Sequence, residues 1–120
     1  MQNYDVIVVG AGVAGLVAAI EMARAGLQVA VIESREIQEP KLGQHVRVSA
    51  LNIVSERILR QMDCWEKIPS EAKSSFREIA VCDAEGVGHV EFSYRDIGRA
   101  YLGHIVGNEA LIKTLLERAK

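Results

Sequence analysis

The amino-acid sequence predicts an α/β fold that opens with a strand–helix–strand unit and later includes a β-hairpin. Three observations predict this fold. A β-branched run over residues 5–9 ends at a glycine, a stretch of helix-forming residues follows, and a second β-branched run occupies residues 28–32. A strand, about a dozen helical residues and a second strand are typical of the start of a right-handed βαβ unit.

The two strands and the helix of this unit have clear sequence limits. The first run, residues 5–9, is continuously β-branched after Asp5, which is typical of a strand buried on both faces of a parallel sheet. Residues 13–24 are mostly good helix formers, and Gly26 supplies the helix stop. Glu33 closes the second run, so we expect the βαβ unit to end near residue 35.

An amphipathic helix is predicted over residues 49–62, after a polar loop over residues 34–46 that shows no periodicity. The apolar residues of this stretch fall on one helical face. They are Leu51, Val54, Ile58, Leu59 and Met62. We expect Trp65 and Ile68 to pack beneath the end of the helix.

A β-hairpin is predicted over residues 78–93, because two alternating stretches flank a glycine-containing turn. Residues 101–106 indicate a further strand, and residues 108–120 a helix with apolar residues along one side. The chain ends on that helix, where a parallel fold would continue with another strand. We therefore expect residues 1–120 to be the N-terminal portion of a larger domain.

Composition excludes several classes of function. The 120 residues carry a net charge of −2, which provides no basic surface for nucleic acid. The cysteines, Cys64 and Cys82, are isolated, which favours neither a metal site nor a disulfide scaffold. The N-terminus lacks the basic region of a signal peptide, and the apolar stretch over residues 13–20 is too short to span a bilayer. These features favour a cytoplasmic chain without a transmembrane segment.

The glycine motif between the first strand and the helix indicates a dinucleotide site. Residues 10–15, Gly-Ala-Gly-Val-Ala-Gly, match the pattern GxGxxG directly after a strand and at the start of a helix. In this context Gly10 allows the tight turn, Gly12 leaves room for a pyrophosphate, and Gly15 lets the helix approach the strand. The free N–H groups around Val13 and Ala14, at the positive end of the helix dipole, would face the phosphates.

Glu33 extends this Rossmann-type pattern to the sugar of the dinucleotide. It ends the second strand at about the ~20-residue spacing from the glycines at which an acidic residue binds the ribose. A carboxylate there accepts hydrogen bonds from the ribose hydroxyls and repels a 2′-phosphate, so the pattern disfavours NADP.

The sequence resembles the FAD-dependent aromatic-ring monooxygenases, the family with the p-hydroxybenzoate hydroxylase fold. Residues 5–16, Asp-Val-Ile-Val-Val-Gly-Ala-Gly-Val-Ala-Gly-Leu, are similar to the N-terminus of that family. Residues 47–51, Arg-Val-Ser-Ala-Leu, resemble its Arg-x-Ser-Ala-Leu segment. Residues 102–108, Leu-Gly-His-Ile-Val-Gly-Asn, resemble the Leu-Gly-x-Ile-Val-Glu-Asn segment of the ubiquinone-biosynthesis hydroxylases, with Gly107 in place of the usual Glu.

This resemblance implies that the cofactor is FAD and gives roles to seven residues. Gly10, Gly12 and Gly15 would take the diphosphate, Glu33 the ribose, Arg35 the adenosine, Arg47 the flavin side, and Asn108 the ribityl and phosphate portion. No catalytic acid or nucleophile is evident within residues 1–120, so the catalytic residues are unassigned.

The resemblance also implies a reaction and its participants. FAD would be reduced transiently by NAD(P)H and would use O₂ to hydroxylate a small aromatic substrate, a polyprenylated phenol in ubiquinone biosynthesis, in assembly with other enzymes of that pathway. We expect residues 1–120 alone to be inactive. Two alternatives stay open: another FAD-dependent dehydrogenase or oxidase, which the segment at residues 47–51 disfavours, and a non-catalytic nucleotide-binding or assembly module.

Overall fold

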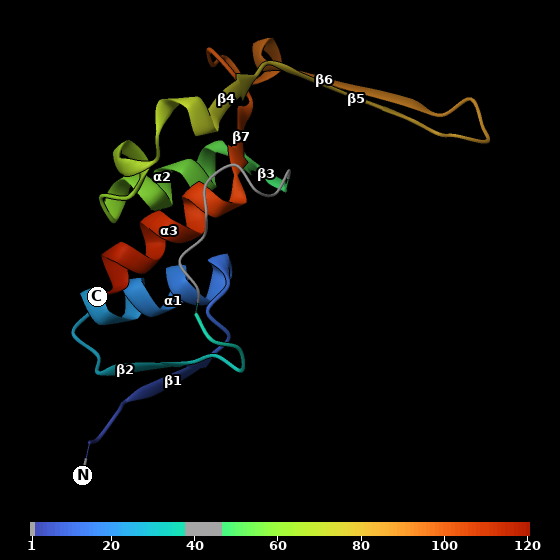
Figure 1. Cartoon of the computed structure of the whole chain (residues 1–120). Helices are drawn as coiled ribbons and strands as arrows, with labels where there is room; N and C mark the ends of the chain where they lie inside the picture. Colours follow the sequence, from blue (N-terminus) through green and yellow to red (C-terminus); the bar gives the residue numbers. More distant parts are fainter. Residues whose placement is uncertain (1, 38–46) are drawn as a thin grey trace.

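The computed structural model describes residues 2–37 and 47–120, so most of the loop predicted over residues 34–46 lies outside the described residues. Seven strands and three α-helices are present in the described part (Figure 1). The strands are β1 (Val6–Val9), β2 (Val29–Ile32), β3 (Val48–Asn52), β4 (Lys73–Phe76), β5 (Glu78–Cys82), β6 (His89–Ser93) and β7 (Gly103–Gly107). The helices are α1 (Val13–Arg24), α2 (Ile53–Gln61) and α3 (Asn108–Ala119), and short 3-10 turns cover Trp65–Lys67, Ser70–Ala72 and Tyr94–Ile97.

The predicted βαβ unit is confirmed. Strands β1 and β2 are parallel, with Val6 opposite Val29 and Val9 opposite Ile32. Helix α1 occupies the predicted residues and ends at Arg24, and Gly26, two residues later, has a φ of +90°, a conformation that side chains disfavour.

The prediction that the first strand is buried on both faces is wrong. Helix α1 packs on one side of the β1–β2 pair, and α3 packs on α1 (Figure 1). On the other side, Ile7 is 58% exposed, Val9 82% and Ile32 51%. Among the described residues, no element covers that face.

The helix predicted over residues 49–62 is also wrong in its first part. Residues 48–52 form β3, which pairs antiparallel with β7, and β7 pairs with β4 on its other side. Helix α2 begins only at Ile53, because the side chain of Asn52 accepts a hydrogen bond from the Ser55 N–H at 2.9 Å and caps the helix there. Val54, which was expected on the apolar face, is 59% exposed.

The hydrophobic core lies where α1, the end of α2, β7 and α3 meet. It includes Trp65 and Ile68, as predicted. The buried cluster consists of Leu16, Ile20, Leu59, Met62, Cys64, Trp65, Ile68, Val106, Ala110, Leu111 and Leu115. Helix α3 packs directly on α1. Asn108, which starts α3, and the glycine turn at the start of α1 are therefore held in place by the same core.

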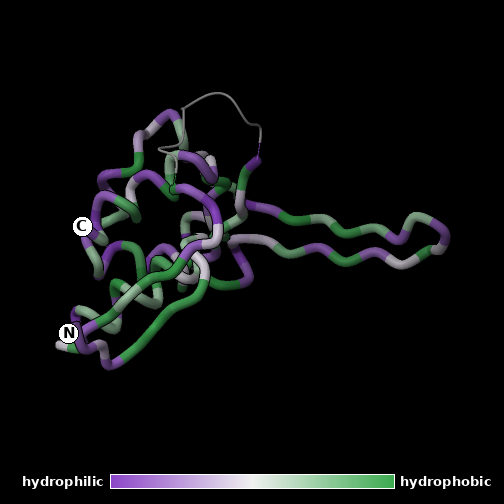
Figure 2. The backbone as a smooth tube through the Cα atoms, turned by 60° about the horizontal axis from the view of Figure 1, so that its bottom comes forward, coloured by the Kyte–Doolittle hydropathy of each residue, from purple (hydrophilic) through white to green (hydrophobic). Residues whose placement is uncertain are grey.

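The predicted hairpin is present as β5 and β6, with Glu78 opposite Ser93 and Cys82 opposite His89. It projects away from the helices (Figure 1) and contributes to overall dimensions of 60 × 31 × 30 Å. Hydrophobic and hydrophilic residues alternate along both arms (Figure 2), yet every residue of β5 is exposed. None of the helices within residues 2–37 and 47–120 has the length and hydropathy needed to cross a bilayer.

Candidate functional site

The glycine turn between β1 and α1 has an open centre and a tightly packed end. Gly10 has a φ of +104°, and its N–H donates to the carbonyl of Ile32 at 2.7 Å. A Cβ at Gly15 would lie 2.0 Å from the carbonyl oxygen of Gly10, so only glycine allows α1 to approach the turn this closely. At Gly12, by contrast, a Cβ would meet no atom within 4 Å. The space in front of Gly12 can therefore be taken by a ligand.

The start of α1 presents unsatisfied hydrogen-bond donors to that space. The first bond inside the helix runs from the Leu16 N–H to the Gly12 carbonyl, at 2.9 Å, so the N–H groups of Val13, Ala14 and Gly15 have no acceptor within the helix. No side chain caps the helix, and no acidic residue lies in its first turn. This arrangement favours the binding of an anion such as a phosphate.

Glu33 lies beside this turn, although it is distant from it in sequence. Its Oε2 accepts the N–H of Ala11 at 2.8 Å, and its Oε1 accepts the N–H of Arg35 at 3.1 Å and the hydroxyl of Ser34 at 3.2 Å. The hydrogen bond from Ala11, followed by the one from Arg35, lowers the pKa of Glu33 below its usual value. The carboxylate is therefore held ionised at the edge of the turn, where it can accept further hydrogen bonds.

An open cavity of about 830 Å³ connects the turn to α3. Ala11 and residues 33–37, Arg35 included, form one wall, and Ile112 and Leu116 of α3 form the other. The structure thus brings Glu33 and Arg35 together at one cavity that begins at the glycine turn. Sequence reasoning missed the contribution of Ile112 and Leu116, which were recognised only as residues of an apolar helix face.

Arg47, Ser49 and Asn108 form the second part of the site. The antiparallel pairing of β3 with β7 places residue 47 beside the start of α3, where the N–H of Asn108 donates to the carbonyl of Arg47 at 3.1 Å. The hydroxyl of Ser49 donates to Oδ1 of Asn108 at 2.5 Å. Asn108 precedes Ile112 by four residues on α3, so both side chains are on the same face of the helix.

Gly107, which precedes Asn108, adopts an ordinary backbone conformation. Its φ is −63° and its ψ is 123°, and a Cβ there would come no nearer than 4.0 Å to Ala72. The departure from the usual Glu at this position therefore does not alter the path of the backbone into α3.

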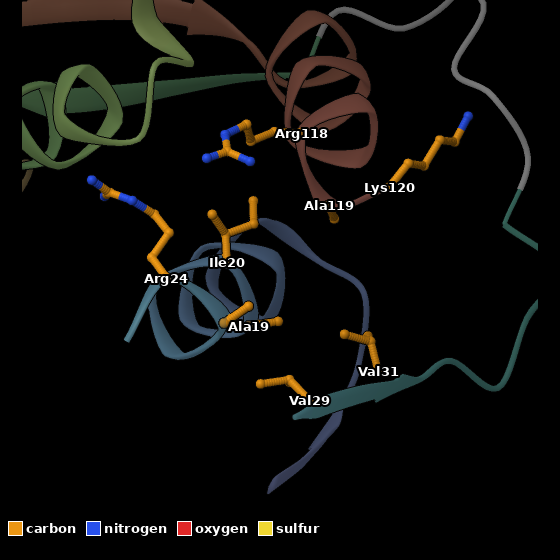
Figure 3. A pocket seen from close by; sticks show the side chains of 9 residues that line it. Ala19, Ile20, Arg24, Val29, Val31, Arg118, Ala119 and Lys120 are labelled. Atoms are coloured by element: carbon orange, nitrogen blue, oxygen red, sulfur yellow. The ribbon is translucent and has the colours of Figure 1, made fainter. Parts of the chain in front are cut away.

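A second cavity, of about 320 Å³, lies away from the glycine turn. Figure 3 shows Val29 and Val31 pointing from β2 toward Ala19 of α1, with Arg24 and Arg118 above them. Neither the glycines nor Glu33 line this cavity.

A buried charged cluster, missed by the sequence analysis, joins α2 to β7. The side chain of Glu56 accepts hydrogen bonds from the Tyr101 hydroxyl at 2.8 Å and from Nε of Arg60 at 3.0 Å. His104 Nδ1 lies 3.1 Å from Oε2 of Glu56, close enough for an ion pair but without hydrogen-bond alignment. Burial raises the pKa of Glu56, but the hydrogen bonds from Tyr101 and Arg60 and the charge of His104 outweigh it, so the pKa is lowered. The spacing of Glu56 and Arg60, four residues apart on a helix, was the available signal.

Comparison with known proteins identifies related domains. A family described as "FAD binding domain" matches residues 5–85. The ubiquinone hydroxylase UbiM of Neisseria meningitidis is 29% identical over 123 residues, which cover 96% of this chain and 26% of UbiM. A probable electron transfer flavoprotein-quinone oxidoreductase of Escherichia coli, YdiS, is 77% identical over 32 residues, 27% of this chain and 8% of YdiS.

Solved structures share the fold along nearly the whole chain. A mutant of PqsL from P. aeruginosa superposes with a TM-score of 0.69 at 21% identity, covering 98% of this chain and 31% of PqsL. Aklavinone-11 hydroxylase, in a ternary complex with FAD and aklavinone, superposes with a TM-score of 0.63 at 24% identity, covering 99% of this chain and 24% of the hydroxylase. The chain spans about a quarter of the length of UbiM and less than a third of each of these structures. The resemblance to FAD-dependent aromatic hydroxylases is thereby confirmed for the domain and its fold.

Proposed function

Because the chain belongs to the FAD binding domain family, we propose that it holds the FAD of a flavoprotein monooxygenase that hydroxylates an aromatic ring. The fold and the cofactor are those of aromatic hydroxylase-type flavoproteins.

One structural observation supports the proposal above the others. Ala11 of the glycine turn and the ionised carboxylate of Glu33 lie at one end of a single cavity, and the open space at Gly12 and the uncapped N-terminus of α1 follow Ala11 directly in the chain. The free N–H groups at the start of α1 are donors that suit the diphosphate of FAD. The carboxylate of Glu33 is an acceptor that suits the ribose hydroxyls of FAD. Gly10, Gly12, Val13, Ala14 and Gly15 would hold the diphosphate and Glu33 the ribose.

The remaining residues would hold the cofactor farther along its length. Arg35, at the same cavity as Glu33, would lie along the adenosine. Arg47 and Asn108, adjacent through the β3–β7 pairing, would contact the flavin side and the ribityl and phosphate portion. A planar guanidinium with several donors suits phosphate and carbonyl oxygens.

Bound FAD supplies the redox chemistry, with NAD(P)H as reductant and O₂ as the source of the transferred oxygen. The protein's own residues bind and orient the cofactor. The similarity to UbiM, a ubiquinone hydroxylase, supports a role in ubiquinone biosynthesis, and the substrate we propose is a polyprenylated phenol. Since this chain spans only about a quarter of UbiM, we expect residues 1–120 by themselves to be inactive.

The test uses the complete natural polypeptide that contains this chain. It should purify yellow and release FAD, not FMN, on denaturation. With NADPH, a prenylated phenol and ¹⁸O₂, one labelled oxygen atom should enter the ring and the other should leave as water. Release of FMN would overturn the cofactor site, and phenol recovered without label while NADPH is consumed would overturn the hydroxylase assignment.

A second candidate is a quinone oxidoreductase that transfers electrons without inserting oxygen. The 77% identity to YdiS over 32 residues favours it. The same assay separates the two functions. A quinone oxidoreductase would reduce a quinone acceptor with no incorporation of oxygen and would do so under anaerobic conditions.

A further inference from the structure

We propose that Ser49 is a positioning residue that fixes the side-chain amide of Asn108 so that its NH₂ group, and not its oxygen, faces the cofactor. This inference rests on the proposed function, in which Asn108 contacts FAD. Ser49 is thereby added to the site, and Asn108 is assigned as a hydrogen-bond donor to FAD.

The hydrogen bonds around Asn108 carry the inference. The hydroxyl of Ser49 donates to Oδ1 of Asn108 at 2.5 Å, a part-buried bond between residues far apart in sequence. An amide offers one acceptor oxygen and one NH₂ group with two donors. Since Ser49 engages the oxygen, the donor end of the amide is the end left for a ligand.

The surrounding backbone holds both partners in place. Ser49 lies on β3 opposite Val106 of β7, and Asn108 begins α3 directly after β7. The N–H of Asn108 is bonded to the carbonyl of Arg47, two residues before Ser49. Asn108 is thus tied to the same strand through its main chain and through its side chain, which leaves the amide little freedom to rotate.

The chemistry of the ligand fits this polarity. The ribityl and diphosphate portion of FAD presents hydroxyl and anionic oxygens, which accept hydrogen bonds from NH₂ donors. An amide rotated by half a turn would present its oxygen to the anionic diphosphate oxygens and repel them. Ser49 therefore acts through Asn108 on the affinity for the cofactor.

The experiment measures the FAD dissociation constant of the complete polypeptide after removal and re-addition of FAD, together with the thermal midpoint and the visible circular dichroism of the bound flavin. Asn108→Ala and Ser49→Ala should each weaken FAD by about three- to tenfold, the scale of one hydrogen bond. The double variant should bind no more weakly than Asn108→Ala alone. Ser49→Thr, which keeps a hydroxyl, should restore binding.

Two further variants separate positioning from a general loss of structure. Ser75→Ala, at an exposed serine on β4 across the same sheet, should leave FAD affinity unchanged. Asn108→Asp should bind FAD more weakly than Asn108→Ala, because Ser49 can still donate to one carboxylate oxygen while the negative charge of the other repels the anionic diphosphate oxygens. This difference would not arise from a purely structural role.

The outcomes distinguish the inference from the proposed function. If Asn108→Ala binds FAD as the wild type does, Asn108 does not contact the cofactor, and that part of the proposed function fails. If Asn108→Ala weakens FAD but Ser49→Ala does not, or the two losses add in the double variant, Ser49 does not act through Asn108 and the inference is overturned. If Ser49→Ala only lowers the thermal midpoint, the contact is structural and the inference is likewise overturned.

Discussion

The carboxylate of Glu33 accepts a hydrogen bond from the backbone N–H of Ala11, in the glycine turn, at 2.8 Å. This contact ties the end of β2 to the turn that follows β1. The carboxylate proposed to bind the ribose is therefore also the group that holds the turn beside it.

Replacing Glu33 should weaken FAD without unfolding the protein. We expect Glu33→Ala to raise the FAD dissociation constant by about tenfold or more, since charge-assisted acceptor bonds are lost. Glu33→Gln should have a smaller effect because the amide oxygen still accepts one bond. Titration of flavin fluorescence measures both, and equal dissociation constants for both variants and the wild type would refute the ribose role.

The pH dependence of FAD binding follows from the lowered pKa of Glu33. The ionised carboxylate is the binding form, so its contribution is present above the folded-state pKa and is lost as the pH falls through it. Because that pKa lies below the usual value of about 4.3, affinity should not change from neutral pH down to about 5. At still lower pH the FAD affinity of the wild type should decline, and this decline should be smaller in Glu33→Gln.

Substitutions at Gly12 and Gly15 should separate cofactor binding from folding. Gly12→Val places a side chain in open space at a φ of −76°, so the fold should persist while FAD occupancy is lost. Gly15→Ala drives a Cβ into the Gly10 carbonyl and should cost about 1–3 kcal/mol of stability or more. Far-UV circular dichroism and thermal melts check the fold, and full flavin in Gly12→Val would rule out the diphosphate site.

Arg47→Ala should weaken FAD modestly and leave the fold intact. The backbone carbonyl of Arg47 accepts the N–H of Asn108. This carbonyl is present whatever side chain replaces that of Arg47. Its side chain is exposed and remains available to a ligand. The matched control is Arg57→Ala, an exposed arginine on α2. If both variants show wild-type FAD affinity and flavin spectra, Arg47 is an ordinary surface residue.

The buried Glu56 cluster should control stability rather than binding. Glu56→Gln should lower the free energy of unfolding by about 1.5–3 kcal/mol at pH 7, because hydrogen bonds to a charged group are lost. The lowered pKa means that this stabilisation is present above the unfolded-state pKa of about 4.3 and is lost as the pH falls through the folded-state value. The difference between wild type and variant should therefore shrink in acid.

Urea unfolding at several pH values measures this difference. Glu66→Gln is a useful control, since Glu66 pairs with the same Arg60 but its side chain is 76% exposed. It should cost at most about 1 kcal/mol. A cost for Glu56→Gln no larger than that of Glu66→Gln would contradict the role of the buried cluster.

Sequence predicted the parts of this molecule that local chemistry determines. The βαβ unit and the hairpin were predicted because strand runs, a glycine motif and a turn each carry their own signal. Residues 49–52 were wrongly predicted to be helical because their apolar spacing also fits a helix, and only pairing with β7 makes them part of a strand. The approach of Ser49 to Asn108 depends on that same long-range pairing, so local sequence could not reveal it.

The β5–β6 hairpin contributes no residue to the hydrophobic core. The hairpin and the packed helices should therefore not unfold as one cooperative unit. A segment whose side chains are exposed opens at a small free-energy cost of its own, independently of global unfolding. Its amide hydrogens should exchange with solvent far sooner than those of α3, and limited proteolysis should cut near Gly86 before it cuts elsewhere in residues 47–120. Substitutions there should alter local exchange rates while the global melting transition keeps its midpoint.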